Sequence, residues 1–268
     1  MQRAAVVMPV FHKQDVTRQA VADCRRESEL VEVVIVDNGG DLDPAEFPDC
    51  VVLTPGENLG WLRGTNLGME HALERGSTSL VALNNDIRLS ENFFSGLLTA
   101  LEARPGDLVA PSYDDVYSPQ NSYFKGAPQD FTPASEEVEA SIIDGTCFAV
   151  TASRWRQLGP LDERNFARRG WGGMTDYVIR NTRAGGKNVV TRRAYLTHAR
   201  GTTAKATMSN YRWYAASEMR TGLRRKYGAN WRTEVYENPE PPEGLKVRLH
   251  DHYRMVRDRF DRPRPSRS

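Results

Sequence analysis

The tripeptide Asn84-Asn85-Asp86 places one carboxylate and two amides directly after a short apolar run, Ser79 to Leu83. This run has the length and partly β-branched composition of a buried strand, and Ser90 to Asn92 resembles the opening of a helix. Open α/β sheets bind ligands beyond the carboxyl ends of such strands. Hard divalent cations prefer oxygen ligands and leave positions open for phosphate oxygens, so the stretch could form half of a metal–diphosphate site. Taken alone, it also fits a turn followed by a helix cap.

Three earlier apolar runs also have strand length. They are Ala4 to Met8, which Pro9 stops and a helical stretch to about Arg26 follows, then Val33 to Val36 and Cys50 to Leu53. Continuous apolar runs are typical of strands buried on both faces, and their alternation with helices predicts a doubly wound, mostly parallel α/β sheet. The second run ends in Asp37-Asn38-Gly39-Gly40, where glycines allow a sharp turn and the polar side chains would face the crevice.

A glycine-rich helix is predicted between the third and fourth strands. Its apolar face would contain Leu62, Thr65, Met69, Ala72 and Leu73, and Gly76 stands where a helix ends. Gly60, Gly64 and Gly68 recur at steps of four, which indicates that either a packed strand or a ligand approaches the backbone closely. The absence of G-x-G-x-x-G and of a terminal GK[ST] excludes a dinucleotide fingerprint and a P-loop.

The second half of the chain is less regular. The patterns predict a helix over 93–103, a short strand over 108–110, a polar irregular stretch over 112–140, a strand over 141–152 with a bend at Asp144-Gly145, strands over 188–191 and 194–197, and a helix over 209–227. The packed side of that last helix would contain Tyr211, Tyr214, Ala215, Met219, Leu223 and Tyr227.

Three residues in this half could do chemistry. Thr175 is placed as a helix cap with Asp176 in the first turn, where the helix dipole favours an ionised carboxylate, although a plain helix-end charge explains the same pattern. His198 follows the last strand and is either a ligand or a structural histidine. Trp171, between Gly170 and Gly172, is either a stacking platform for the ring of a ligand or a packed core residue.

The composition of the chain limits its possible partners and location. The 36 basic and 35 acidic residues leave too weak a net charge for nucleic acid to be the main partner. Cys24, Cys50 and Cys147 are far apart and are expected to be buried thiols. No leader and no transmembrane run are found, which favours a cytoplasmic location. The basic tail is expected to be solvated, with peripheral membrane contact as the alternative for KVRLHDHYRMVRDRF.

Five stretches in a fixed order resemble the inverting family-2 glycosyltransferases with the GT-A fold, especially the bacterial rhamnosyltransferase-like and polysaccharide-biosynthesis branch. They are VVMPVF with VVIVDNGG, ENLGWLRGTNLG, LNNDIRL, DGTCFAVTASRWRQLGPLDERNF and GGMTDYVIR. The resemblance covers about Ala4 to His198. It implies a GT-A domain over 1–205, a mostly parallel Rossmann-like sheet flanked by helices, with a C-terminal helical extension and basic tail over 206–268.

The resemblance also implies roles for single residues. Asp176 would be the catalytic base, and Asp86 would hold Mn²⁺ or Mg²⁺ on the donor diphosphate, with His198 as a further metal ligand. Asp37 would face the nucleotide base, and Asn58 and Asn66 would shape the ribose pocket. The remaining donor or acceptor contacts would be Pro9, Val10, Gly60, Arg63, Asn84, Asn85, Gly145 and Trp171.

Two departures from the family pattern bear on this assignment. Asn84 replaces the first Asp of the metal motif, which removes one charge, and Thr175 replaces the Glu before the catalytic Asp. The main hypothesis is therefore an inverting, metal-dependent transferase, and the alternative is a non-catalytic nucleotide-sugar-binding or scaffold protein. A sugar nucleotidyltransferase is disfavoured because PVFHKQD stands where a basic glycine-rich loop is needed.

The sequence limits the possible substrates but does not select one donor or one acceptor. Asp37 could accept from the imide N–H that uracil and thymine share, so UDP- and dTDP-type donors both fit. The acceptor would bear a hydroxyl and be a glycan, a lipid-linked glycan or a protein. The C-terminal helices could also support a homo-oligomer.

Overall fold

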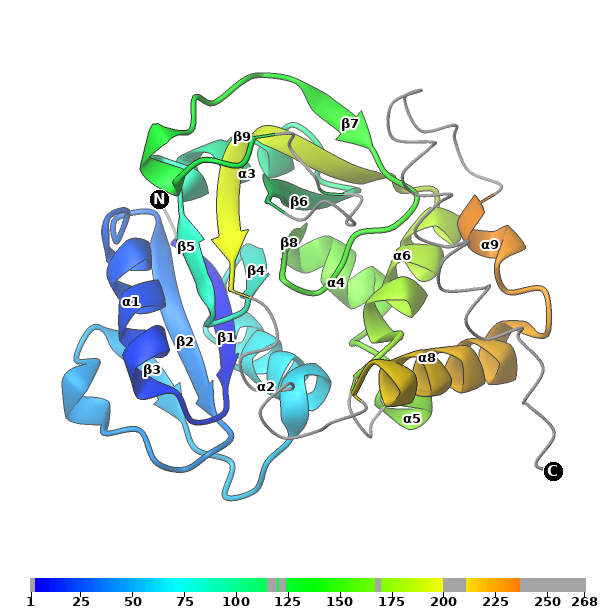
Figure 1. Cartoon of the computed structure of the whole chain (residues 1–268), viewed down its shortest axis with the longest axis horizontal. Helices are drawn as coiled ribbons and strands as arrows, with labels where there is room; N and C mark the ends of the chain where they lie inside the picture. Colours follow the sequence, from blue (N-terminus) through cyan, green and yellow to red (C-terminus); the bar gives the residue numbers. More distant parts are fainter. Residues whose placement is uncertain (1–2, 115–119, 121–123, 167–169, 200–210, 237–268) are drawn as a thin grey trace, which may run out of the picture.

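The computed structural model describes residues 3–114, 120, 124–166, 170–199 and 211–236. Within these residues, one mixed sheet has the strand order β3-β2-β1-β4-β8-β6-β9-β5, and β7 pairs with β9 (Figure 1). The strands are β1 (Ala4–Val10), β2 (Val31–Asp37), β3 (Cys50–Leu53), β4 (Ser79–Leu83), β5 (Ile87–Leu89), β6 (Leu108–Tyr113), β7 (Glu137–Glu139), β8 (Cys147–Thr151) and β9 (Asn188–His198).

Helices cover both faces of the sheet. They are α1 (Gln14–Arg25), α2 (Gly60–Glu74), α3 (Phe93–Glu102), α4 (Ala152–Leu158), α5 (Glu163–Phe166), α6 (Gly173–Arg183), α8 (Tyr211–Tyr227) and α9 (Thr233–Tyr236), with 3-10 turns η1 (Pro44–Glu46) and η2 (Pro128–Asp130). Apolar residues of α1 and α3 share one core with one face of the strands. Those of α2, α4, α6 and α8 share the other core. The α/β class predicted from the sequence is confirmed.

The two halves of the sheet differ in direction. Strands β3, β2, β1 and β4 are parallel, as predicted. In the second half β8 runs antiparallel to β4 and β6, and β9 runs parallel to β6 but antiparallel to β5 and β7. An apolar run does not reveal the direction of its strand, so the pattern could not separate the two halves.

Several boundaries differ from the predicted ones. Strand β1 continues through Pro9, which lies past the last residue of β1 paired with β4 and so has a strand neighbour on one side only. The short strand β5 was not predicted, and residues 188–198 form one strand rather than two. The strand predicted over 141–152 is shorter in the structure: it begins at Cys147, and it ends at Thr151 because α4 begins at Ala152. Thr175 does not cap α6, because Gly172 holds that position at φ 94°.

The structure separates the two explanations for the glycines of α2. A methyl group on Gly68 would lie 2.3 Å from Val7 Cγ1, and one on Gly64 would lie 3.2 Å from Pro9 Cβ. These two glycines therefore allow the helix to pack closely on β1. Gly60 has φ +68° and open space around it, so it serves the turn into the helix.

The C-terminal helices belong to the same core as the sheet. Leu223 of α8 and Val235 of α9 are buried there with Trp231 between them, and α8 lies against α5 (Figure 1). Tyr214, predicted on the packed side of α8, is 41% exposed, which corrects that prediction. The side chain of Tyr211 and the predicted domain boundary at 205 lie outside the described residues.

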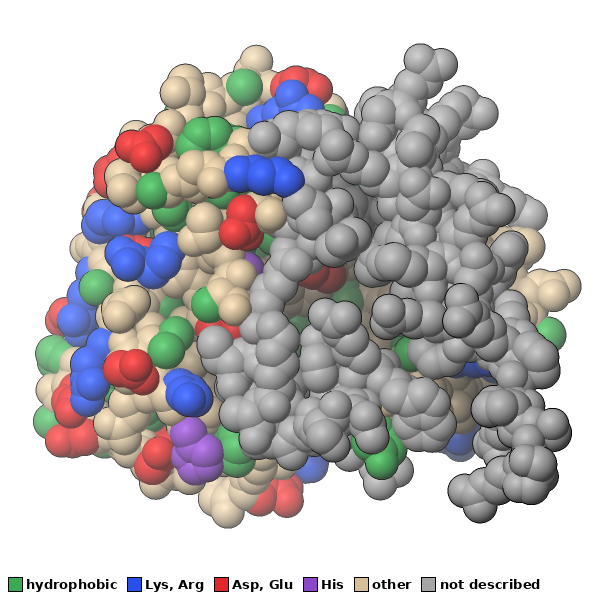
Figure 2. Space-filling view, viewed as in Figure 1, with side chains coloured by type: hydrophobic (Ala, Val, Ile, Leu, Met, Phe, Trp, Pro, Cys, Tyr) green, Lys and Arg blue, Asp and Glu red, His purple; other side chains and the backbone are tan. Residues whose placement is uncertain are grey.

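The surface and the cysteines fit the composition. Figure 2 shows acidic and basic side chains interspersed over the described part of one face. In the described chain, no helix is long and apolar enough to cross a membrane. Cys24 and Cys147 are buried and Cys50 is half-buried, all as free thiols, and burial raises the pKa of each.

Candidate active site

Asp86 and His198 meet at the carboxyl edge of the parallel half of the sheet. Asp86 follows β4, and His198 ends β9 opposite Ile87 of β5. His198 Nε2 lies 3.0 Å from Asp86 Oδ1, and the two side chains are 14% and 11% exposed. Strand pairing therefore joins residues that are 112 positions apart in the chain. The sequence predicted both as metal ligands, and the structure brings them together.

The donor atoms at this place fit a divalent cation. Asp86 Oδ1 and His198 Nε2 lie 3.0 Å apart, and a carboxylate oxygen and an imidazole nitrogen are both atoms that could ligate one divalent cation. Asn84, two residues before Asp86 in the chain, has a buried Oδ1 without a hydrogen-bond partner, so this oxygen could be a further ligand. Among the described residues, no three His, Cys, Asp or Glu side chains form a metal cage. A cation here would need oxygens from a bound phosphate or from water.

A carboxylate and a hydroxyl hold His198 in place. Asp114 Oδ1 accepts the backbone N–H of His198 at 3.2 Å, and Thr146 Oγ1 lies 3.4 Å from His198 Nδ1. If Nδ1 carries the ring proton and donates to Thr146, the lone pair of Nε2 faces Asp86 and is available to a metal.

Asp144 is a carboxylate of this cluster to which the sequence reasoning gave no chemical role. Its Oδ2 accepts a hydrogen bond from the Tyr113 hydroxyl, and its Oδ1 accepts the backbone N–H of Thr146 at 2.9 Å. The backbone N–H of Asp144 donates to Gln120 Oε1 at 2.8 Å. The side chain is only partly buried. The sequence indicated a bend at Asp144-Gly145 before a strand. The neighbouring residues do not indicate which strand pairs with that one, so they could not place Asp144 beside Asp86.

Asp176 is enclosed. Its side chain is 0% exposed, and Oδ2 accepts from Arg180 Nε at 2.9 Å. On the other side, Oδ1 accepts from the Tyr227 hydroxyl and lies near Lys226 Nζ, both at 2.6 Å. Burial and the hydrogen bond to this carboxylate raise the pKa of Tyr227. The catalytic role of Asp176 stays a prediction from the sequence, and the enclosure argues against it.

Comparison with known proteins identifies the family. The model of glycosyl transferase family 2 matches residues 5–154. Uncharacterized proteins of Mycobacterium tuberculosis and Mycobacterium bovis are 32% identical over 225 residues, which cover 83% of this chain and 85% of theirs. The chain belongs to glycosyl transferase family 2.

Solved structures confirm the fold of this family-2 glycosyltransferase. GalNAc-T7, solved with UDP, GalNAc and Mn²⁺, superposes at a TM-score of 0.63 with 14% identity over 94% of this chain and 55% of that one. The mannosyltransferase PcManGT of Pyrobaculum calidifontis, solved with GDP-Man and Mn²⁺, superposes at 0.62 with 15% identity over 95% and 70%. At these identities the likeness shows the GT-A fold.

In this glycosyltransferase, Asp37 holds its own loop. Oδ1 accepts the N–H groups of Gly39 and Gly40 at 3.0 and 2.9 Å, and Oδ2 accepts that of Leu42 at 3.0 Å. The residue is 2% exposed. A carboxylate offers about four acceptor sites, so little remains for a nucleotide base. Recognition of the base by Asp37 stays a prediction.

Four predicted donor contacts of the transferase are engaged or buried within the protein, and their role in donor binding stays a prediction. Pro9 and Val10 are buried within β1. The amide of Asn85 donates to Thr17 Oγ1 on α1 at 2.9 Å, away from the Asp86–His198 pair. The amide of Asn66 is fully engaged with the segment after α4, through Leu161 and Glu163.

The remaining predicted contacts lie around the start of α2. Asn58 accepts the N–H of Gly60 at 2.8 Å, and Arg63 pairs with Glu57 at 3.0 Å. A methyl group on Gly145 would lie 2.7 Å from the ring of Trp61, so that indole packs directly on the backbone beside Asp144. Trp171 is 41% exposed, which removes it from the core.

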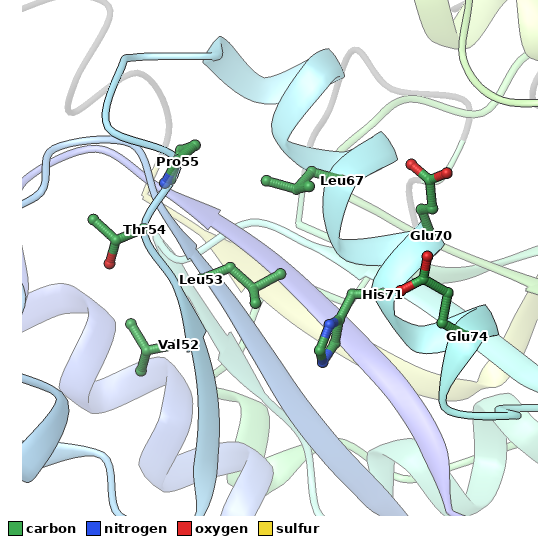
Figure 3. A pocket seen from close by; sticks show the side chains of 8 residues that line it. All are labelled: Val52, Leu53, Thr54, Pro55, Leu67, Glu70, His71 and Glu74. Atoms are coloured by element: carbon green, nitrogen blue, oxygen red, sulfur yellow. The ribbon is translucent and has the colours of Figure 1, made fainter.

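A separate groove of about 430 Å³ lies between the edge strand β3 and α2 (Figure 3). Its lining residues are Val52, Leu53, Thr54, Pro55, Leu67, Glu70, His71 and Glu74. None of them was predicted as a donor or metal contact. The candidate active site of the transferase therefore rests on the Asp86–His198 cluster.

Proposed function

We propose that this glycosyltransferase moves one sugar, with inversion, from a nucleoside-diphosphate sugar to an acceptor hydroxyl, with Mn²⁺ or Mg²⁺ bound. The observation that carries the proposal is the Asp86–His198 pair, 3.0 Å apart, with the unpartnered Asn84 Oδ1 nearby. The UDP, GDP-Man and Mn²⁺ in the solved structures of similar fold support it.

The residues of the chain have distinct tasks in this proposal. Asp86, His198 and Asn84 would hold the cation, which supplies charge neutralisation for the departing diphosphate. Thr146 and Asp114 hold His198 in the orientation that the pair needs. A carboxylate near the acceptor must take up the proton of the attacking hydroxyl.

The finer assignments stay predictions from the sequence. They comprise a UDP- or dTDP-type donor, a glycan, lipid-linked glycan or protein acceptor, the rhamnosyltransferase-like branch, a cytoplasmic location and a homo-oligomer. Contact of the basic tail with a membrane concerns residues outside the described part.

A thermal-shift screen tests the donor site without an acceptor. Uridine, thymidine, guanosine and cytidine diphosphates are each added with and without Mn²⁺. A ligand at 100 times its dissociation constant stabilises the native state by about 2.7 kcal/mol, so we expect a Mn²⁺-dependent rise with one or two of them. Folded protein that responds to none of the four would overturn the proposal.

One observation favours the second candidate, a nucleotide-sugar-binding protein without transfer activity. The predicted base, Asp176, is enclosed in this structure. Release of nucleoside diphosphate from a donor sugar at an enzymatic rate would exclude that candidate. Metal-dependent nucleotide binding without release would favour it.

A further inference from the structure

We propose that Asp144, rather than Asp176, accepts the proton of the acceptor hydroxyl; this inference rests on the proposed function. It follows from three features of the described residues. They are the enclosure of Asp176, the place of Asp144 beside the Asp86–His198 pair, and the hydrogen bonds that fix the carboxylate of Asp144.

Asp176 has no open side from which a substrate could approach. Arg180 of its own helix covers Oδ2, and Lys226 and Tyr227 of α8 cover Oδ1. A general base must come within hydrogen-bond reach of the proton that it removes. The three partners would have to leave before Asp176 could do so, and removing the partners of a buried charge is costly. Asp176 acts instead as the anchor that holds α8 to α6.

Asp144 lies beside the pair that would hold the cation. Because β8 runs antiparallel to β4, the residues before β8 stand at the carboxyl end of β4. The backbone N–H of Asn84 donates to the carbonyl of Thr146 at 2.9 Å, which joins the two strand ends. Thr146 then connects both groups, since its N–H binds Asp144 and its hydroxyl lies 3.4 Å from His198.

The surroundings of Asp144 suit a base. The Tyr113 hydroxyl and the Thr146 N–H each donate to one carboxylate oxygen, which fixes the orientation of the side chain. Gln120 holds the backbone N–H, and the ring of Trp61 packs on Gly145. Two donors occupy about half of the acceptor sites of a carboxylate. The residue is partly exposed, whereas the side chain of Asp176 has no exposed surface.

The chemical step balances with no further reagent. The acceptor O–H proton passes to a carboxylate oxygen of Asp144 while the acceptor oxygen forms a bond to the anomeric carbon. The bond from that carbon to the diphosphate oxygen breaks, and its electron pair leaves with the nucleoside diphosphate. The carboxylic acid then returns the proton to water.

The test compares Asp144→Asn, Asp176→Asn and the exposed control Asp130→Asn. Nucleoside diphosphate release is measured from UDP-glucose, UDP-galactose, GDP-mannose and dTDP-rhamnose with Mn²⁺, with water and methyl glycosides as acceptors. Binding of the corresponding nucleoside diphosphate with Mn²⁺ is measured by calorimetry as a readout that is independent of turnover. Midpoints of thermal unfolding identify variants that fail to fold.

We expect Asp144→Asn to lower the turnover number about 10²- to 10⁴-fold with unchanged nucleotide affinity and unchanged thermal midpoint. Asp176→Asn should lower the thermal midpoint and keep its turnover per folded molecule. Tyr113→Phe removes one of the two donors that orient the carboxylate, so it should lower the turnover number while nucleotide affinity and thermal midpoint stay unchanged. That loss is measurable even if Asp144→Asn fails to fold.

Two results would overturn the inference. Wild-type turnover in folded Asp144→Asn would exclude its carboxylate from the step. Loss of turnover in Asp176→Asn at an unchanged thermal midpoint would return the role to Asp176. Failure of the wild type to bind any nucleotide with Mn²⁺ would instead overturn the proposed function itself.

Discussion

The hydroxyl of Tyr227 donates a hydrogen bond of 2.6 Å to Asp176, a carboxylate with no exposed surface. Through this bond and the contact of Lys226 Nζ with the same oxygen, α8 closes over the first turn of α6. Asp176, which the family resemblance suggested as the catalytic base, therefore links α6 to α8.

Asp176→Asn should destabilise the fold strongly. It removes one charge of a buried network and leaves Arg180 and Lys226 without their partner, which costs about 3–5 kcal/mol for a broken buried ion pair. Tyr227→Phe should cost less, about 1–3 kcal/mol, because one hydrogen bond to a charged group is lost. Urea unfolding measures both. A free energy of unfolding equal to that of the wild type in Asp176→Asn would contradict the anchoring role.

Alkaline pH should weaken the fold. Burial raises the pKa of Tyr195 to about 12, and burial with the hydrogen bond to Asp176 raises that of Tyr227 above its ordinary value of 10.0. Above pH 10 the unfolded chain loses phenolic protons that the folded chain keeps. The free energy of unfolding therefore falls as pH rises, by about 1.4 kcal/mol per pH unit for each such tyrosine.

Urea unfolding between pH 9 and pH 11.5 measures this slope. Tyr227→Phe and Tyr195→Phe should each make it shallower. A slope that neither substitution changes would show that other groups set the alkaline limit.

Asp86→Asn should abolish the Mn²⁺-dependent response to nucleotide while the protein stays folded, because the charged oxygen donor of the pair is lost. We expect metal affinity to fall at least about 100-fold, since even partners outside the coordination shell contribute 10- to 100-fold. Calorimetry with Mn²⁺ and the responsive nucleotide measures the loss. Asn85→Ala is the matched neighbour, since its amide binds Thr17. Equal losses in both variants would contradict the assignment of Asp86 as the metal ligand.

Gly68→Ala should destabilise the protein although alanine favours helices. The added methyl would lie 2.3 Å from Val7 Cγ1, and overpacking of a tight core costs about 1–3 kcal/mol. Gly106→Ala serves as the control because nothing lies within 4 Å of its added methyl. Thermal unfolding compares the two. A stabilised Gly68→Ala protein would show that α2 can move away from β1 at little cost.

A metal role for Asp86 could be predicted from the sequence because Asp86 follows an apolar run, and strand ends gather at one edge of a sheet. His198 was expected as a further ligand only from the family resemblance, because the residues around it fit a structural histidine equally well. Asp144 shows the limit of such reasoning. Its place depends on β8 running antiparallel to β4, and neither composition nor periodicity encodes the direction of a strand.

The remaining differences between the predicted and the observed structure arise from contacts with residues far away in the sequence. The first turn of α3 is capped by Glu27, whose carboxylate accepts the N–H groups of Phe94 and Ser95 at 2.8 Å, whereas Asn92 beside the helix makes no side-chain cap. Asp176 was correctly placed in a first helical turn. Its burial depends on Tyr227, 51 residues later, so no local pattern could distinguish an open carboxylate from an enclosed one.

The register of strand β9 determines where His198 lies in the site. Its pairing with β6 passes from Thr191 opposite Pro111 to Tyr195 opposite Ser112, so three residues are accommodated in an irregularity before His198. Each residue of a strand spans about 3.3 Å and alternates between faces. Loss or gain of one residue between Tyr195 and His198, where the pairing is regular again, would turn the imidazole to the opposite face of the sheet. Natural variation in chain length within this family should therefore spare the stretch from Tyr195 to His198 and fall in the loops between strands.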